Sequence, residues 1–154
     1  MNNKLSLITE QDQEPWYKEG LRFKCTECGK CCTGAPGYVW VNKEEVAEMA
    51  TYLKITIKEF SRLYLRSIHG KLSLKEKPHT YDCIFLKNQK CQLYAKRPMQ
   101  CRTFPWWPSQ LKNKEAWSEA AQHCEGICEE APVVNCAHIQ TELKIQENYI
   151  ANNP

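Results

Sequence analysis

Four cysteines fall within eight positions near the N-terminus, in the stretch RFKCTECGKCCTGAPG at residues 22–37. They are Cys25, Cys28, Cys31 and Cys32, and the last two are adjacent. The glycines and the proline that follow disfavour regular structure, so we expect a loop. Four thiols this close in a loop indicate either a shared metal or disulfide partners elsewhere, and the rest of the chain must fold around them.

The cellular compartment bears on that choice. The first residues, MNNKLSLITEQDQEPW, lack the apolar core of a secretory signal, and no stretch approaches the roughly 20 apolar residues of a membrane helix. We therefore expect a cytoplasmic protein that does not contact a membrane. In a reducing cytosol, ten cysteines favour metal binding over disulfides. A disulfide scaffold remains the alternative, since an even cysteine count fits both.

Composition excludes several function classes. The chain has 154 residues, 25% charged and 42% hydrophobic, as expected for one soluble globular domain. The net charge is +3 and the basic residues are scattered, which argues against nucleic-acid binding. The sequence shows no phosphate-binding glycine loop, nucleotide fingerprint or Ser/His/Asp arrangement, and this argues against a hydrolase or an NAD enzyme.

Periodicity and turn residues predict an α+β fold: a small single domain of short helices and a β-hairpin wrapped around a cysteine-ligated metal centre. Helices are expected at 43–54, where Asn42 and Glu45 form a capping box, and at 57–68. A last helix is expected at about 137–150. Strands are expected at 38–41 and 71–76, and a hairpin at 81–94 that turns at residues 88–89.

This reading divides the chain into three parts. Residues 1–20 form an N-terminal arm, residues 21–136 the metal-binding domain, and residues 137–154 a C-terminal helix and tail. In the middle part, the hairpin would bring Cys83 and Cys91 near each other from opposite arms. Pro98 would begin a single helical turn that carries Cys101.

The spacing of the first cysteines narrows the type of centre. Two consecutive C-x-x-C steps are similar to the C-x2-C-x2-C run of bacterial ferredoxins, but the adjacent Cys32 departs from it. Neighbouring side chains in an extended loop point in different directions. Cys31 and Cys32 therefore favour two neighbouring centres or one polynuclear centre. Zinc would normally bring two separated C-x-x-C pairs, whereas here there is one dense cluster.

A longer set of motifs resembles a known family. The stretches FKCTECGKCC, DCIFL and CQLYAKRPMQCRTFPWW, followed later by Trp117 and CEGIC, are similar to the CxxCxxCC cysteine-cluster family, a YkgJ-like group of zinc- or iron-chelating proteins. The flagellin lysine methylase FliB is a relative of that group. The resemblance runs from about residue 21 to residue 128.

The resemblance implies eight metal ligands: Cys25, Cys28, Cys31, Cys32, Cys83, Cys91, Cys101 and Cys124. The family pattern usually ends in Cys-Pro-Gly-x-Gly. Here Glu125 replaces the proline and Cys128 the last glycine, so Cys128 and Cys136 are additional thiols. Members are often labelled iron–sulfur oxidoreductases, which implies an iron–sulfur cluster, most simply [4Fe–4S], or zinc.

Three other side chains lie beside these cysteines. Arg97 and Arg102 flank Cys101 and could bind the cofactor by neutralising a multi-thiolate centre, because buried negative charge needs a partner, or could hold an anionic substrate. A surface salt bridge is the alternative for both. His123 precedes Cys124 and is either a substitute ligand or an exposed helical residue.

Three functions follow as hypotheses. The first is an iron–sulfur protein that exchanges electrons with a redox partner, with a possible oxidoreductase activity. The second is a non-enzymatic module that zinc stabilises and that recruits an unknown protein partner. The third is a component of a FliB-like methylation system, for which this chain is short.

Overall fold

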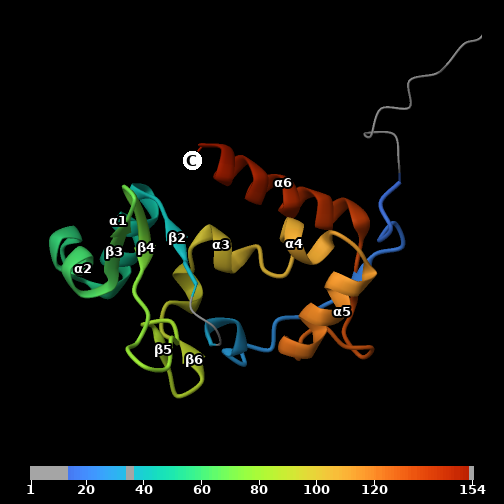
Figure 1. Ribbon diagram of the computed structural model, residues 1–154, viewed down its shortest axis with the longest axis horizontal. Coiled ribbons are helices and arrows are strands. Elements are labelled where there is room, and N and C mark those ends of the chain that lie inside the picture. Colours follow the sequence, from blue (N-terminus) through green and yellow to red (C-terminus); the bar gives the residue numbers. More distant parts are fainter. Residues whose placement is uncertain (1–13, 34–36, 153–154) are drawn as a thin grey trace, which may run out of the picture.

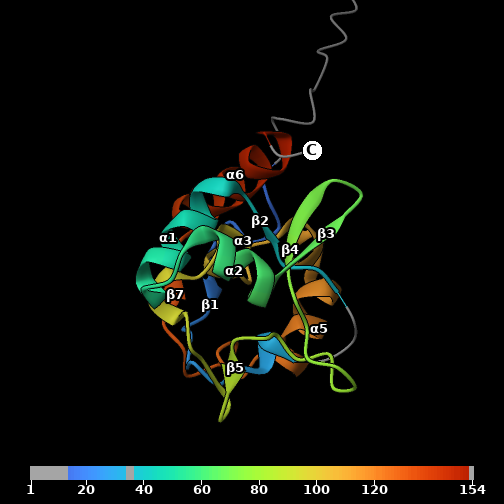
Figure 2. The same cartoon turned by 90° about the vertical axis from the view of Figure 1, so that its left-hand side faces the viewer.

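A three-stranded antiparallel sheet and two helices form one half of the molecule (Figure 1). The structure is a computed structural model that describes residues 14–33 and 37–152. The sheet order is β2-β4-β3. The bounds are β2 Trp40–Val41, β3 Leu65–Ile68, β4 Lys71–Leu74, α1 Lys43–Leu53 and α2 Ile57–Tyr64. Figure 2 shows the molecule from the left-hand side of Figure 1, with α1 and α2 in front and β3 and β4 beside them.

The first predicted helix is confirmed, including its cap. The Glu45 amide donates to the Asn42 side chain at 2.8 Å, and the Asn42 amide donates to the Glu45 carboxylate at 3.0 Å. These two bonds satisfy donors that a helix start leaves free.

The second helix is shorter than predicted, and the assignment of residues 65–68 to it was wrong. That segment is strand β3, which pairs with β4 from Leu65↔Leu74 to Ile68↔Lys71. His69 and Gly70 form the two-residue loop with φ of 48° and 80°, the backbone of a tight hairpin turn. The hairpin buries Leu65 and Leu74 in a hydrophobic core, called the first core, which also contains Met49, Phe60 and Phe85. This burial outweighs the helical pattern of residues 65–68.

The other half of the molecule is mainly helical. It contains α4 Pro108–Leu111, α5 Lys114–His123, α6 Cys136–Asn152, and a two-stranded pair of β1 Leu21–Arg22 with β7 Val133–Val134. Helix α6 confirms the predicted last helix and runs along the top of the view in Figure 1. A second core of Tyr17, Trp106, Leu111 and Ile139 lies here, with the Trp106 and Trp117 rings stacked 5.4 Å apart.

Short elements fill the space between the two halves. They are η2 Lys30–Cys32, β5 Leu86–Lys87, β6 Lys90–Cys91, η3 Tyr94–Lys96 and α3 Met99–Arg102. The predicted hairpin is confirmed with shorter strands, and Asn88 and Gln89 form its turn with φ of 51° and 62°. Helix α3 is the expected turn after Pro98, which precedes the helix as its N-cap.

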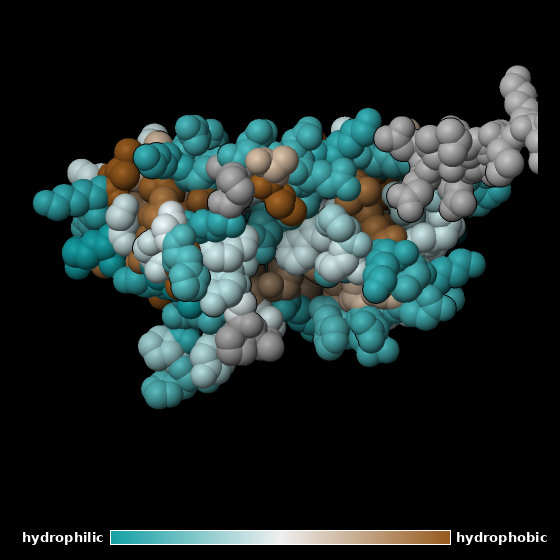
Figure 3. Space-filling model, turned by 45° about the horizontal axis from the view of Figure 1, so that its top comes forward, coloured by the Kyte–Doolittle hydropathy of each residue, from teal (hydrophilic) through white to brown (hydrophobic). Residues whose placement is uncertain are grey.

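The chain is a single small α+β domain, as predicted, and it has two hydrophobic cores. The face of the molecule drawn in Figure 3 is hollowed between the two halves, and hydrophobic residues lie inside the hollow. Residues 1–13 of the predicted arm and residues 34–36 of the predicted loop lie outside the described residues. The three-part division of the chain stays a prediction. No helix of the described segments is long and apolar enough to cross a membrane.

Candidate metal centre

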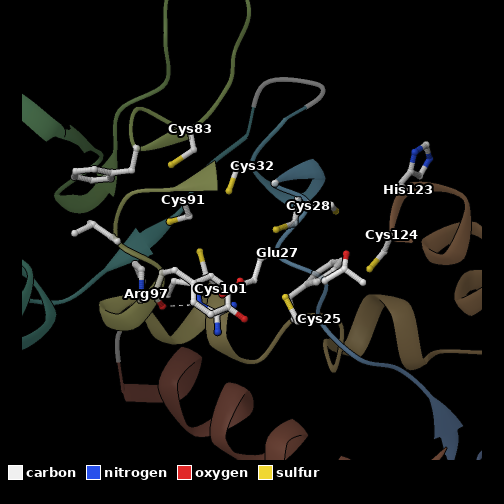
Figure 4. Close-up of a pocket in the computed structure, with 18 of the residues that line it drawn as sticks. Cys25, Glu27, Cys28, Cys32, Cys83, Cys91, Arg97, Cys101, His123 and Cys124 are labelled. Atoms are coloured by element: carbon white, nitrogen blue, oxygen red, sulfur yellow. Dashed lines mark hydrogen bonds between the residues drawn. The ribbon is translucent and has the colours of Figure 1, made fainter. Parts of the chain in front are cut away.

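Eight cysteines line one cavity between the two halves of the molecule (Figure 4). The cavity has a volume of about 60 Å³, more than the roughly 10–15 Å³ that one water-sized sphere occupies. The eight are the residues that the family resemblance implied: Cys25, Cys28, Cys31, Cys32, Cys83, Cys91, Cys101 and Cys124. Cys128 and Cys136 are not among the lining residues; Cys128 is exposed and Cys136 packs against the second core.

A glycine allows the cysteine loop to touch the β5–β6 hairpin. Gly29 has φ of 76° and stands just before η2, which carries Cys31 and Cys32. A Cβ atom at Gly29 would lie 2.5 Å from the Gln89 carbonyl oxygen, closer than packed atoms allow. Only glycine permits both this backbone conformation and this approach, and the approach brings Cys28 and Cys31 toward the hairpin that carries Cys91.

A second close approach joins the cysteine loop to the segment after α5. The Lys24 amide donates to the Gly126 carbonyl at 3.0 Å, and a Cβ at Gly126 would lie 2.4 Å from the Lys24 carbonyl oxygen. The Thr26 hydroxyl donates to the Glu125 carboxylate at 2.8 Å. These contacts hold Cys124, which ends α5, beside Cys25 and Cys28. Helix α5 ends at His123 with Cys124 as its C-cap, so Cys124 and Cys128 do not share a helix.

Four of the thiols form a group in mutual contact, which we call the first thiol group: Cys31, Cys32, Cys83 and Cys91. The sulfur of Cys32 is within hydrogen-bond range of the other three. Hydrogen bonding to Cys32 lowers the pKa of Cys31 to about 6, with burial opposing and Arg97 assisting. It also lowers the pKa of Cys91 to about 7, and that of Cys83 below its usual range.

Cys32 is the member of the first thiol group that holds its proton most strongly. Hydrogen bonds to Cys31, Cys83 and Cys91 raise the pKa of Cys32 well above its usual range, and burial adds to this. Cys32 is thus the neutral member of the group, and its three neighbours are inclined to be thiolates. Thiolates are soft ligands that attract a metal cation, so the donor set fits a thiophilic metal or cluster.

The side chains do not already stand around one point. Among residues 14–33 and 37–152, no three His, Cys, Asp or Glu side chains are arranged to hold a single metal ion. The reason lies in the first thiol group itself, where the sulfurs contact one another through Cys32 instead of surrounding a common centre. Ligation would therefore require rotation of these side chains.

The other thiols lie on the far side of the cavity or beneath it. Cys25 and Cys124 lie across the cavity from Cys83 and Cys91, and Cys28 lies between them and Cys32 (Figure 4). Burial raises the pKa of Cys124. Cys101, on α3, lies below Cys91 in the same view. Burial and then the neighbouring sulfurs raise the pKa of Cys101 well above its usual range, so it is a neutral thiol until a cation approaches.

The two arginines of the sequence prediction lie in different surroundings. Arg97 lines the cavity, and its charge favours the thiolate forms of Cys31 and Cys91. Its guanidinium carbon lies 3.8 Å from the centre of the Tyr94 ring. Arg102 is exposed at the end of α3 and is not among the lining residues. His123 is exposed but is among the residues that line the cavity, and Figure 4 shows its ring directed away from Cys124.

Sequence reasoning missed several lining residues. The walls include Leu74, Phe85 and Leu93 from the first core, and Tyr94, whose pKa is raised chiefly by hydrogen bonding to Cys25. Glu27 also lines the cavity. The one sequence feature that could have indicated Tyr94 as a lining residue is its position three residues after Cys91.

Comparison with known proteins places this site in a family. The sequence model of the CxxCxxCC family, described as "Putative zinc- or iron-chelating domain", matches residues 24–125, more than half of the chain. The chain belongs to the CxxCxxCC family. The family's described cofactors are zinc and iron, which agrees with the thiol donor set. The relation to FliB stays a prediction.

The chain is similar in sequence to a curated protein of an archaeon. The relative is "Uncharacterized protein MJ0661" of Methanocaldococcus jannaschii, 40% identical over 93 residues, which cover 58% of this chain and 48% of that protein. The chain thus matches about half the length of this relative. No solved structure matches the chain.

Proposed function

We propose that the first thiol group binds an iron–sulfur cluster, most simply [4Fe–4S], and that the protein exchanges single electrons with a redox partner protein. The observation that carries this proposal is the contact of Cys32 with Cys31, Cys83 and Cys91 in a cavity lined by eight cysteines. Four thiolates are the ligand set of one such cluster.

The walls of the cavity suit a charged redox centre. Leu74, Phe85 and Leu93 exclude water on the side of the first core, and exclusion of solvent is one determinant of a cluster's potential. Arg97 supplies a positive charge beside Cys31 and Cys91. The cluster would supply the electron-accepting chemistry, while these residues would balance its charge and keep it dry.

Zinc is the second candidate, and a different observation favours it. Cys83 and Cys91 pack against the core of one half, whereas Cys124 follows α5 in the other half, which has its own core. A metal bound by both halves would fasten them together, as structural zinc sites do. In that case the protein would be a non-enzymatic interaction module with an unidentified protein partner.

The thiols outside the first group have two alternatives. Cys25, Cys28, Cys101 and Cys124 either form a second four-thiolate site or remain structural. Cys25 and Cys124 lie across the cavity from Cys83 and Cys91 (Figure 4), which supports a second site, whereas Cys101 lies beside Cys83 and Cys91 of the first group.

Anaerobic purification with metal and acid-labile sulfide analysis tests the proposal. One cubane predicts about four iron and four sulfide per chain and a broad absorption near roughly 400 nm that bleaches on reduction. Cys83→Ser should abolish most of that iron, whereas Cys128→Ser, an exposed thiol outside the cavity, should not. Zinc without sulfide would support the structural alternative. Metal-free, folded protein with paired disulfides would refute both.

A further inference from the structure

A second cavity reaches the first thiol group from another side, and we call it the aromatic cavity. Its volume is about 200 Å³. Cys31, Cys32, Cys83 and Cys101 line it together with residues of β4 and α3. Because these four cysteines also line the metal cavity, the sulfurs stand between the two spaces. A small molecule in the aromatic cavity would therefore contact the metal centre directly.

Four aromatic side chains line this cavity: Tyr38, Tyr81, Phe104 and Trp107. Trp107 is held in place, since its indole N–H donates to the Gln100 carbonyl at 2.9 Å and its ring meets Phe104 edge-on at 5.1 Å. Rigid aromatic surfaces favour flat ligands, because rings pack in stacked or edge-to-face pairs.

Tyr81 is one of seven non-glycine residues in the described segments that have a positive φ. It has φ of 60°, a left-handed conformation that is rare and strained for a bulky residue. Hydrogen bonds of the loop hold it there: the Tyr81 amide donates to the Lys77 carbonyl at 3.1 Å, and the Lys77 amide to the Asp82 carbonyl at 2.7 Å. Yet 48% of Tyr81 is exposed, so burial does not account for its place. Such strain concentrates at ligand-binding positions.

The charges of the lining are already engaged by the protein. Glu76 accepts from the Gly37 amide at 2.7 Å and lies 3.8 Å from Arg66. The Lys75 ammonium donates to the Arg62 carbonyl at 2.8 Å. What a ligand would meet is therefore aromatic rings, the thiols and charges that already have partners in the protein. Because neither Glu76 nor Lys75 is left to pair with a charged group, the lining favours an uncharged ligand.

We propose that the aromatic cavity binds a planar, uncharged aromatic small molecule, gripped by Tyr81 and Trp107, with one edge against the first thiol group. This inference rests on the proposed metal centre, because it names the class of molecule that would meet that centre.

Equilibrium dialysis of the anaerobic, metal-loaded full chain tests the ligand class. The probes are 2-naphthol, which is uncharged at neutral pH, and 2-naphthoate, which has the same rings and a carboxylate. We expect one 2-naphthol per chain, bound at least tenfold more tightly than 2-naphthoate. Equal binding of the two probes, or no binding of 2-naphthol, would overturn the proposal.

Tyr81→Asn tests the position. Asparagine tolerates a left-handed backbone, so this variant should keep its metal and unfold at the same or a higher temperature. Its affinity for 2-naphthol should fall roughly threefold to tenfold. Tyr52→Asn is the matched control, since Tyr52 is 46% exposed on α1, outside the cavity. Unchanged affinity in Tyr81→Asn with full metal content would refute the inference and leave the proposed function intact.

Discussion

The amide of Cys83 donates a hydrogen bond to the carbonyl of Cys32 at 2.7 Å. Two thiols from distant parts of the sequence are thus joined through their backbones, independently of any metal. This bond, the Gly29–Gln89 approach and the Lys24–Gly126 bond arrange the cysteine loop against its neighbours. Such preorganisation reduces the cost of ordering these segments when a metal binds.

Gly29→Ala should damage both folding and metal loading. The alanine would have to adopt φ of 76°, and its Cβ would lie 2.5 Å from the Gln89 carbonyl oxygen. We expect a loss of about 1–3 kcal/mol or more in the free energy of unfolding, measured by denaturant titration, and a lower metal content. Gly70→Ala is the control, because Gly70 has φ of 80° but nothing within 4 Å of its Cβ. If both variants load metal equally, the close approach does not matter to the site.

Arg97→Leu should lower the reduction potential of a bound cluster. Arg97 stabilises negative charge on Cys31 and Cys91, and reduction adds one more negative charge. An interaction of ~1 kcal/mol corresponds to roughly 40 mV for one electron, which redox titration can resolve. Arg102→Leu removes the same charge from an exposed position outside the cavity lining and should shift the potential much less. Equal shifts would show that Arg97 has no special role.

The local parts of this fold could be predicted from the sequence. The Asn42–Glu45 capping box and the Asn88–Gln89 turn are short-range devices, and both are present. The end of α2 could not be predicted, because the choice between helix and strand for residues 65–68 depends on pairing with β4 and burial of Leu65. Local periodicity carries no information about that pairing.

The candidate site, like the fold, could be predicted from the sequence only in part. The eight cysteines could be named from the family resemblance, but their partition into thiol groups depends on tertiary contacts such as those of Cys32. Arg97 follows η3 and Arg102 ends α3, so the two arginines have different surroundings, which their nearness to Cys101 in the sequence does not reveal. The aromatic cavity was missed because Tyr38, Tyr81 and Trp107 come from separate segments.

The stability of the fold should decline at alkaline pH through Tyr149. Its hydroxyl donates to the Glu45 carboxylate at 2.9 Å, and burial, followed by the charge of Glu45, raises its pKa above the usual value. A raised pKa favours the neutral form in the folded state. The contribution is therefore fully present below about pH 10, the pKa of an unfolded tyrosine, and is lost as the pH rises above it.

Tyr149→Phe isolates this contribution. At pH 7 we expect a loss of roughly 1–3 kcal/mol in the free energy of unfolding, because the hydrogen bond reaches a charged acceptor. The difference between wild type and variant should shrink as the pH rises above 10. A constant difference from pH 7 to 11 would contradict the assignment. The comparison is made between variants because other tyrosines and lysines also titrate in this range.

Removal of the metal should loosen the junction between the two halves while leaving the first core folded. The thiols link segments that otherwise meet through few backbone bonds, and metal binding contributes directly to folding free energy. After chelation, hydrogen exchange should accelerate at the Lys24 amide, bonded to Gly126, and at the Cys83 amide, bonded to Cys32. The Phe60 amide, bonded to Thr56 in the first core, should keep its protection, since its neighbours do not depend on the site. Equal acceleration at all three would indicate global unfolding, and no acceleration at Lys24 or Cys83 would show that the metal does not hold the halves together.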